Sequence, residues 1–557
     1  MFLRKNYIIG IIIILLSTTN GNTLISNQNF LYSSEYIKNY LYGSILHQSN
    51  QHNLAAKNLF KINKLKGKHS SYDIKNIISL VINGNINQAA NIIQDVDKIY
   101  SDIFILDFIK AIYLIKINKS QQAVFELNNI KNNDPIFMEM INNLKFWIQI
   151  KNKNIRQKVL IKNFKSNYPS IKLINQFLSS RYIENSKLYK FYDNEILNSD
   201  ALTRYKILSA WNYIRDEKNN QAFDMLNSLL KIDGNNLLLK QSILDIKYKK
   251  YKFISFFDPK KFNHNLSEIF YLYANLYQQR GDKVLFEMLL SISIDFNKKF
   301  LSNNLIDFEQ KVLNYDNFKF NYLFLSNLKN IGSEYKWYIN YQLAARNKKN
   351  ISILVNSINL NDYFLKEKYF DLGNYYRLNK NYELALDFYK KIEKLQPVQN
   401  WTYYYYVGIC YERLKQWKKS EEYLKKSLTI APQEYSVINY LAYSWLERRE
   451  NIEEATMMLK NAVELSKWEK GYIIDSLGWA YFLKKDFDKA EKLLKIAYEK
   501  NTNESEVYDH YGDVLWMQKK FLQARYVWNN AINLENIDSK RKKNIKNKII
   551  NGLIPSD

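Results

Sequence analysis

The stretch IIDSLGWAYFLKKDFDKAEKLLKIAY, from Ile473 to Tyr498, holds the side chains that come nearest to an active site in this sequence. Asp475, Ser476 and Gly478 would suit a hydrolase whose serine attacks a carbonyl group. Such a serine usually stands in a Gly-x-Ser-x-Gly turn after a strand, whereas the apolar residues here recur every three or four positions, as in a helix. We therefore interpret Ser476 as a helix residue and predict no catalytic residue in this stretch.

The histidines and the cysteine also favour structural roles. His47 and His52 are five positions apart, whereas two ligands on one helical face are three or four apart. His510, two positions before Gly512, is expected to be a packed, hydrogen-bonded imidazole. Cys410 is the single cysteine, so no internal disulfide can form. Because Walker A, Rossmann and His-Glu-x-x-His motifs are also missing from the sequence, we predict a protein that is not an enzyme and has no metal ion or cofactor.

The composition predicts a folded and almost wholly helical chain. Of the 557 residues 46% are hydrophobic, which is enough to build several cores. Gly occurs 14 times and Pro 6 times, so tight turns are scarce and long helices are favoured. The formal net charge of +26 has two explanations. One is a genome rich in AT codons, which enriches Lys, Asn and Ile; the other is attraction to anionic lipid, cell-wall polymer or nucleic acid.

A small residue recurs with a nearly constant period in the last third of the chain. In the segments DLGNYY, YVGICY, YLAYSW, SLGWAY and HYGDVLW the successive spacings are 35, 34, 36 and 34 residues, and a second small residue follows each 12 or 13 positions later. This is the spacing of tetratricopeptide repeats (TPRs), in which small side chains let two paired helices approach closely. The first small residues are Gly373, Gly408, Ala442, Gly478 and Gly512, and the second are Ala385, Ser420, Ala455, Ala490 and Ala524. We expect Gly478 and Ala490 to mark where the two helices of one repeat press together.

The same pattern continues upstream in a weaker form. Three further pairs are twelve positions apart: Gly43 and Ala55, Ala111 and Ala123, and Ala210 and Ala222. Between about residues 225 and 365 the pattern blurs, and we interpret this part as divergent helical hairpins. The predicted fold is an all-α, right-handed superhelical solenoid of TPR-type helical hairpins. Divergent repeats are assigned to residues 30–365, TPR repeats to 366–535, and a basic C-terminal capping segment to 536–557.

The N-terminus predicts export. Arg4 and Lys5 precede an apolar run over residues 7–16 and then the small and polar residues STTNG, which is the layout of a secretory signal peptide at 1–21. An uncleaved signal anchor, which would tether the chain to the inner membrane, is the alternative. Either way we expect an exported, periplasmic protein that has no nucleic-acid partner. The net charge permits peripheral association with a membrane.

The two closing repeats carry a narrower resemblance. DSLGWAYFLKKDFDKAEKLLKIAY followed by DHYGDVLWMQKKFLQARYVWNNAI resembles the closing repeats of a bacterial family of exported TPR proteins about as long as this chain. Some members are outer-membrane lipoproteins that act as adaptors for carboxyl-terminal processing proteases and help them degrade cell-wall hydrolases. The resemblance implies a periplasmic interaction scaffold and a protease as one candidate partner. The chain departs from those members because no lipid-bearing cysteine follows the apolar run.

The first helix of each repeat should line the concave groove of the solenoid, where a protein partner would bind. Positions six and three before the small residue, and one and four after it, face this groove, and many of them are aromatic, as in the anchor residues of protein interfaces. The predicted groove residues are Asn374, Arg377, Tyr405, Asn439, Tyr443, Asp475, Trp479, Asp509, Asp513 and Trp516. The alternative is that about half of them pack against the neighbouring repeat.

Three functions are compatible with these observations. The favoured one is a non-enzymatic periplasmic scaffold that acts as an adaptor for an envelope protease or a cell-wall hydrolase. The alternative is a structural component of an envelope assembly or polymer-secretion complex. The third is an enzyme hidden within residues 225–365. No residue argues for or against homo-oligomers.

Overall fold

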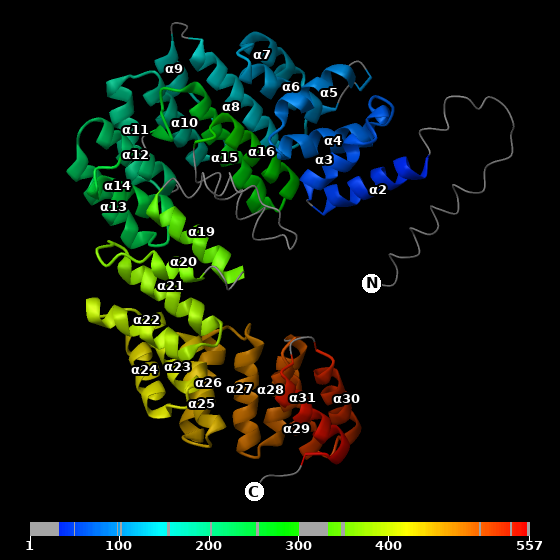
Figure 1. The fold of residues 1–557 in the computed structure, drawn as a ribbon, viewed down its shortest axis with the longest axis vertical. Helices are drawn as coiled ribbons and strands as arrows, with labels where there is room; N and C mark the ends of the chain where they lie inside the picture. Colours follow the sequence, from blue (N-terminus) through cyan, green and yellow to red (C-terminus); the bar gives the residue numbers. More distant parts are fainter. Residues whose placement is uncertain are drawn as a thin grey trace, which may run out of the picture. The chain divides into compact units, whose positions relative to one another are not determined.

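The computed structural model describes residues 33–553 except 50, 97–98, 101–102, 153–155, 201–202, 252–254, 300–331, 347–350, 501–502 and 535–536. The predicted signal peptide therefore lies outside the described residues. All regular elements within the described residues are helices, and consecutive helices pack in pairs (Figure 1). The predicted all-α solenoid of helical hairpins is confirmed. None of the described helices combines the length and the apolar character needed to cross a membrane.

The chain divides into two compact units, Met1–Ile339 and Asn340–Asp557. This division precedes the position 365/366 at which the sequence analysis placed the change of repeat type, and that assignment stays a prediction. The helices of the first unit are α2 (Ser34–Gln48), α3 (His52–Phe60), η1 (Asn63–Leu65), α4 (Ser70–Ile82), α5 (Ile86–Val96), α6 (Phe104–Lys116), α7 (Ser120–Asn129), α8 (Pro135–Lys151), α9 (Gln157–Lys162), α10 (Pro169–Tyr182), α11 (Ser186–Asn198), α12 (Thr203–Arg215), α13 (Asn219–Ile232), α14 (Leu237–Lys247), α15 (Phe262–Arg280) and α16 (Lys283–Phe296). Helix α19 (Ser333–Arg346) crosses the division.

The described helices of the second unit are a short helix, α20, followed by five complete hairpins and a closing helix. They are α20 (Ile351–Asn356), α21 (Leu365–Leu378), α22 (Tyr382–Leu395), α23 (Trp401–Arg413), α24 (Trp417–Ile430), α25 (Tyr435–Glu447), α26 (Ile452–Leu465), α27 (Gly471–Leu483), α28 (Phe487–Lys500), α29 (Ser505–Met517), α30 (Phe521–Ile532) and α31 (Ser539–Asn551). Side-chain caps help to fix where helices begin: Asn381 and Asn400 each accept a hydrogen bond from a backbone N–H in the first turn of α22 and α23.

In the first unit the hairpin of α15 and α16 folds back onto earlier helices. Helix α16 contacts α4, and α15 contacts α8 and α10 (Figure 1). The hydroxyl of Ser291 donates to the carbonyl of Val81 at 2.8 Å, and the amide of Asn143 donates to the hydroxyl of Tyr273 at 2.6 Å. Within the blurred part of the sequence, the described helices α15 and α16 thus form a hairpin that packs against helices far away in the sequence.

In the second unit each repeat glycine faces a large side chain of the paired helix sixteen positions later. A Cβ atom on Gly478 would lie 2.7 Å from Cγ of Leu494, and one on Gly408 would lie 2.9 Å from Cγ of Leu424. Such distances are too short for carbon atoms, so a larger residue at either position would force the leucine to shift. The atoms nearest to a Cβ on Gly478 belong to Leu494, a residue that the sequence analysis did not pair with this glycine. Ala490 is fully buried, and its contact with Gly478 stays a prediction.

The turn inside each hairpin also recurs. Lys380, Lys415, Arg449, Lys485 and Lys519 each stand seven positions after the small residue, with φ between 57° and 63°. This left-handed conformation redirects the chain from the first helix to the second, and it strains a residue that has a Cβ atom. Glycine fills the corresponding place in the first unit at Gly281, where φ is 83°.

Candidate functional site

The predicted groove residues all lie on the first helices of the C-terminal hairpins, α21, α23, α25, α27 and α29. The half-buried ones are Asn374, Arg377, Tyr405, Tyr443, Trp479 and Trp516, and the buried ones are Asn439, Asp475, Asp509 and Asp513. This region has two parts. The aromatic part is made by the first helices α21, α23 and α25, and the charged part is made by α27, α29 and the closing helix α31. Binding by these residues stays a prediction.

The aromatic part is a set of rings stacked from one first helix to the next. The rings of Phe370 and Tyr406 are stacked with centroids 6.0 Å apart, and the guanidinium of Arg377 lies 3.9 Å from the centroid of Tyr406. Tyr405 contacts Tyr440 of the following first helix edge to face at 5.7 Å. These contacts hold half-buried rings in fixed positions, so they can receive a partner with little loss of side-chain entropy.

Two amides flank these rings and differ in their partners. The hydroxyl of Tyr389, on the second helix α22, donates to Oδ1 of Asn374 at 2.8 Å. Asn439 is buried, and its Oδ1 has no hydrogen-bond partner among the described residues. A buried acceptor without a donor destabilises the folded state, so Asn439 costs stability where Asn374 does not.

The charged part centres on a buried ion pair between neighbouring first helices. Nδ1 of His510 lies 2.9 Å from Oδ2 of Asp475, and the indole of Trp479 stacks on the imidazole with ring centroids 4.1 Å apart. The hydroxyl of Tyr443 donates to Glu506 at 2.9 Å. Asp475, Trp479 and Tyr443 therefore each contact a residue of the neighbouring first helix α29. This is the packing role that the sequence analysis gave as the alternative for about half of the predicted groove residues.

This environment keeps His510 charged. Burial alone would lower the pKa of His510, but the carboxylates of Asp475, Glu506 and Asp509 outweigh it and raise the pKa to about 9. Burial also acts to raise the pKa of Glu506, and the cations His510 and Arg541 reverse that effect and lower it. At neutral pH the site therefore holds an imidazolium between carboxylates.

The closing helix α31 supplies two more cations. Nζ of Lys548 lies 2.7 Å from carboxylate oxygens of both Asp509 and Asp513, and Nη2 of Arg541 donates to Glu506 at 2.8 Å. Burial raises the pKa of Asp513 to about 7 despite the opposing effect of Lys548. Two of the predicted groove carboxylates therefore contact the chain's own C-terminal segment.

Trp516 also packs inside the chain. Its ring lies 5.6 Å from that of Trp528 and 4.9 Å from the guanidinium carbon of Arg525. Gly552, just after α31, lies so close to the Trp516 ring that a Cβ atom there would overlap it. The segment predicted to cap the solenoid thus covers the last hairpin.

Sequence reasoning missed Arg541 and Lys548 as parts of this site. Both were included in a basic run without a partner. Each stands 35 positions after the acid that it contacts, Glu506 and Asp513, and this offset is one repeat length. Reading the repeat period past residue 535 would have found them.

Ser476 and Cys410 occupy ordinary helix positions. The hydroxyl of Ser476 donates to the carbonyl of Tyr472 at 3.0 Å, one turn earlier in α27. Cys410 is fully buried, and burial raises the pKa of its thiol to about 12. A thiol with such a pKa is almost entirely protonated at neutral pH and is a poor nucleophile.

His47 and His52 stand on the successive helices α2 and α3, so they do not share one helical face. Their rings meet edge to face with centroids 4.9 Å apart. Nδ1 of His47 lies 2.9 Å from Oγ of Ser79, and Nε2 of His52 lies 3.3 Å from Glu287. Within the described residues no three metal-ligating side chains come together. The absence of a metal ion stays a prediction.

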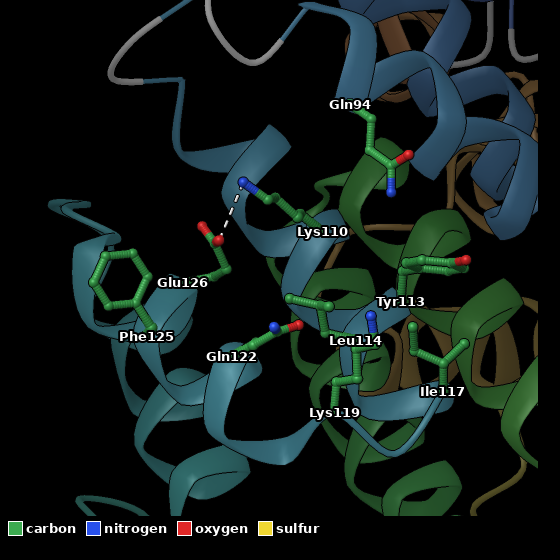
Figure 2. Close-up of a pocket in the computed structure, with 9 residues that line it drawn as sticks. All are labelled: Gln94, Lys110, Tyr113, Leu114, Ile117, Lys119, Gln122, Phe125 and Glu126. Atoms are coloured by element: carbon green, nitrogen blue, oxygen red, sulfur yellow. Dashed lines mark ion pairs between the residues drawn. The ribbon is translucent and has the colours of Figure 1, made fainter.

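A cavity of about 410 Å³ opens between α5, α6 and α7 in the first unit. Figure 2 shows the ion pair of Lys110 and Glu126 on one side of it, with Nζ and Oε1 3.1 Å apart. The other lining residues are Gln94, Tyr113, Leu114, Ile117, Lys119, Gln122 and Phe125. Phe125 is 64% exposed, so the cavity is open to solvent at its rim.

Comparison with known proteins gives partial likenesses. No family model matches the chain. A curated relative, the Sol locus transcriptional repressor of Clostridium acetobutylicum, is 34% identical over 120 residues, which are 21% of this chain and 36% of that protein. The chain thus spans about a third of the length of this relative.

Solved structures similar to the chain include several TPR proteins. A thermophilic TPR protein of Thermus thermophilus is 18% identical, with 33% of this chain and 99% of that chain covered and a TM-score of 0.30. Yeast Tom70 is 12% identical, with 93% and 95% covered and a TM-score of 0.29. PilF of Pseudomonas aeruginosa is 16% identical, with 33% and 91% covered and a TM-score of 0.29. The fold assignment rests on the helix pairs of this chain itself.

Proposed function

We propose that the chain is a non-enzymatic scaffold that binds a segment of a partner protein along the first helices α21, α23 and α25. The observation that carries this proposal is the set of half-buried rings beside Arg377, in which Tyr406 stacks on Phe370 and also contacts Tyr405. Aromatic and arginine side chains held in place before binding are the usual anchors of protein interfaces.

Export to the periplasm is part of the proposal, and it is supported by the basic and apolar layout of residues 1–21. Within that compartment we propose a role as an adaptor for a carboxyl-terminal processing protease or a cell-wall hydrolase. The support for this role is the resemblance of the two closing repeats. An uncleaved anchor would keep the same scaffold at the inner membrane.

Site-specific photo-crosslinking tests the binding surface. A benzophenone amino acid would replace Tyr405 on the inner helix α23, and in a matched control it would replace Tyr526, which is 66% exposed on the second helix α30. Tyr405 is preferred to Tyr443 and Trp479, because these two contact Glu506 and His510 of α29. The ring contacts of Tyr405 are with Trp401, Tyr406 and Tyr440, which lie on the proposed binding helices α23 and α25. Crosslinks would be formed in intact cells and identified by mass spectrometry.

We expect one partner protein to be crosslinked at position 405 and not at position 526. A protease or hydrolase as that partner would support the adaptor role. Recovery of a set of membrane-complex subunits would instead favour the structural component of an envelope assembly. Equal crosslinking at both positions would show that the inner helices are not the binding surface.

A further inference from the structure

The contact between α29 and α31 follows the same repeat register as the contact between α27 and α29. Arg541 meets Glu506 and Lys548 meets Asp513, both with an offset of 35 positions, and the pair of His510 and Asp475 has the same offset. Helix α31 therefore stacks as the first helix of a sixth repeat, and its direction is that of α29.

Helix α31 is attached less extensively than the first helices before it. Its buried apolar side chain is Ile545, whereas α29 buries residues along its whole length. Its remaining anchors include the three ionic contacts of Arg541 and Lys548, the partly buried side chain of Ile549, and the bond from Nε of Arg525 to the carbonyl of Ile549 at 2.8 Å. A terminal helix that packs on one side is easier to exchange than one enclosed between two neighbours.

The face of α29 that α31 contacts is acidic, and the contacting face of α31 is basic with one aliphatic residue. Glu506, Asp509 and Asp513 are spaced three and four positions apart, so they form one face of α29. In α31 the complementary face is Arg541, Ile545 and Lys548, spaced four and three apart, which puts the two cations roughly 10 Å apart along the helix. The whole chain carries a net charge of +26, so this anionic face stands out against its surroundings.

We propose that the face of α29 and α30 covered by α31 is a docking site for a helix of a partner protein. That helix would carry a basic residue, an aliphatic residue four positions later and a second basic residue three positions after that. Helix α31 is the chain's own occupant of this site. This inference rests on the proposed scaffold function and adds the partner's chemistry. A partner helix displaces α31 and takes over its contacts with Glu506, Asp509 and Asp513.

The test uses the α31 sequence itself as the probe. A fluorescein-labelled peptide of residues 538–553 is titrated by fluorescence anisotropy against the full wild-type chain and against the full R541E/K548E chain, in which repulsion from the acids opens the site. We expect the opened chain to bind in the micromolar range. The wild-type chain should bind at least tenfold more weakly, because its tethered α31 competes at an effective concentration near millimolar.

Two controls distinguish charge-dependent binding of the peptide from non-specific binding. Addition of D509N and D513N to the opened chain should weaken peptide binding at least tenfold. A peptide with alanine in place of Arg541 and Lys548 should also bind the opened chain at least tenfold more weakly. Circular dichroism and protection of the Cys410 thiol verify that each variant is folded. If R541E/K548E does not fold, K548A is the milder replacement, and it should bind the peptide more tightly than wild type does.

The proposal is overturned if the folded, opened chain does not bind the peptide, or if wild-type and opened chains bind it equally. Concentration-dependent dimerisation of the wild-type chain through exchange of α31 would also overturn it, because the occupant would then be a second copy. The peptide titration reports on α29 and the crosslink at position 405 reports on α23. Failure of this inference and failure of the scaffold function are thus separate results.

Discussion

His510 and Asp475 form a buried ion pair between two successive first helices, with Nδ1 and Oδ2 2.9 Å apart. They are separated by 35 residues, and the stacked indole of Trp479 excludes water from one face of the imidazole. A buried charge pair is tolerated when both members are well bonded, and loss of one member leaves the other uncompensated. The pair therefore makes the joint between α27 and α29 sensitive to pH.

The first prediction concerns the titration of His510. We expect its pKa to be about 9, because the surrounding carboxylates outweigh the effect of burial. Selective ¹³C labelling of the histidine rings gives five NMR signals in the full chain, and the signal missing in H510Q identifies this residue. In D475N the pKa should fall by more than one unit. A pKa near 6.5 in the wild-type chain would contradict the ion pair.

The same shift predicts how stability depends on pH. The folded-state pKa of His510 lies above its ordinary value of 6.5, so the pair contributes fully below pH 6.5 and loses its contribution as pH rises through about 9. The loss is on the order of 3 kcal/mol in the free energy of unfolding. Urea unfolding at pH 6 and at pH 9.5 measures it, and H510Q should show a smaller difference between the two.

The second prediction concerns the contact of Gly478 with Leu494. An alanine at 478 would place its Cβ 2.7 Å from Cγ of Leu494, so G478A should lower the free energy of unfolding by about 1–3 kcal/mol. L494A should lower it by about 2–5 kcal/mol through a cavity. The double variant should cost less than the sum, because the new methyl group occupies part of the space left by Leu494. Additive costs would show that the two residues do not meet.

The repeats themselves could be predicted from the sequence because their determinants are local. Gly478 and Gly512 are needed where a helix of the same hairpin crosses at close range, and such a requirement leaves a small residue at a fixed interval. The hairpin around Gly281 was recognisable for a different reason, because the turn between its helices has a φ of 83°, which glycine adopts freely.

Contacts between distant segments could not be predicted in this way. Ser291 bonds the carbonyl of Val81 across 210 positions, and no local spacing encodes that the hairpin of α15 and α16 folds back there. The groove assignment failed to distinguish binding from packing for a related reason. Asp509 and Asp513 look like free groove carboxylates until Lys548 is placed beside them.

The third prediction concerns the reactivity of Cys410. Because this thiol is fully buried and its pKa is raised to about 12, a thiol reagent at pH 8 should leave it unmodified in the folded chain. Modification should begin as urea unfolds the C-terminal unit. The matched control is T429C in a C410A background, where the new cysteine stands at an exposed position of α24 and should react at once. Rapid labelling of the wild-type chain would show that α23 and α24 open readily.

The fourth prediction concerns the strained turn between α27 and α28. Lys485 has a φ of 63°, a conformation that costs a residue with a Cβ atom roughly 1–2 kcal/mol and that glycine adopts freely. Glycine also loses more backbone entropy on folding, so K485G should stabilise the chain by a net amount of about 0.5–1 kcal/mol.

The matched control for K485G is K492G, at an exposed position inside α28, where glycine should instead destabilise the chain by about 1 kcal/mol. Seven of the ten tryptophans lie after residue 400, so the urea midpoint from tryptophan fluorescence reports mainly on the C-terminal unit. Opposite shifts of this midpoint would show that Lys485 bears a conformational cost to direct the chain from α27 into α28. Equal losses in both variants would mean that the side chain of Lys485 stabilises the turn by more than its backbone strain costs.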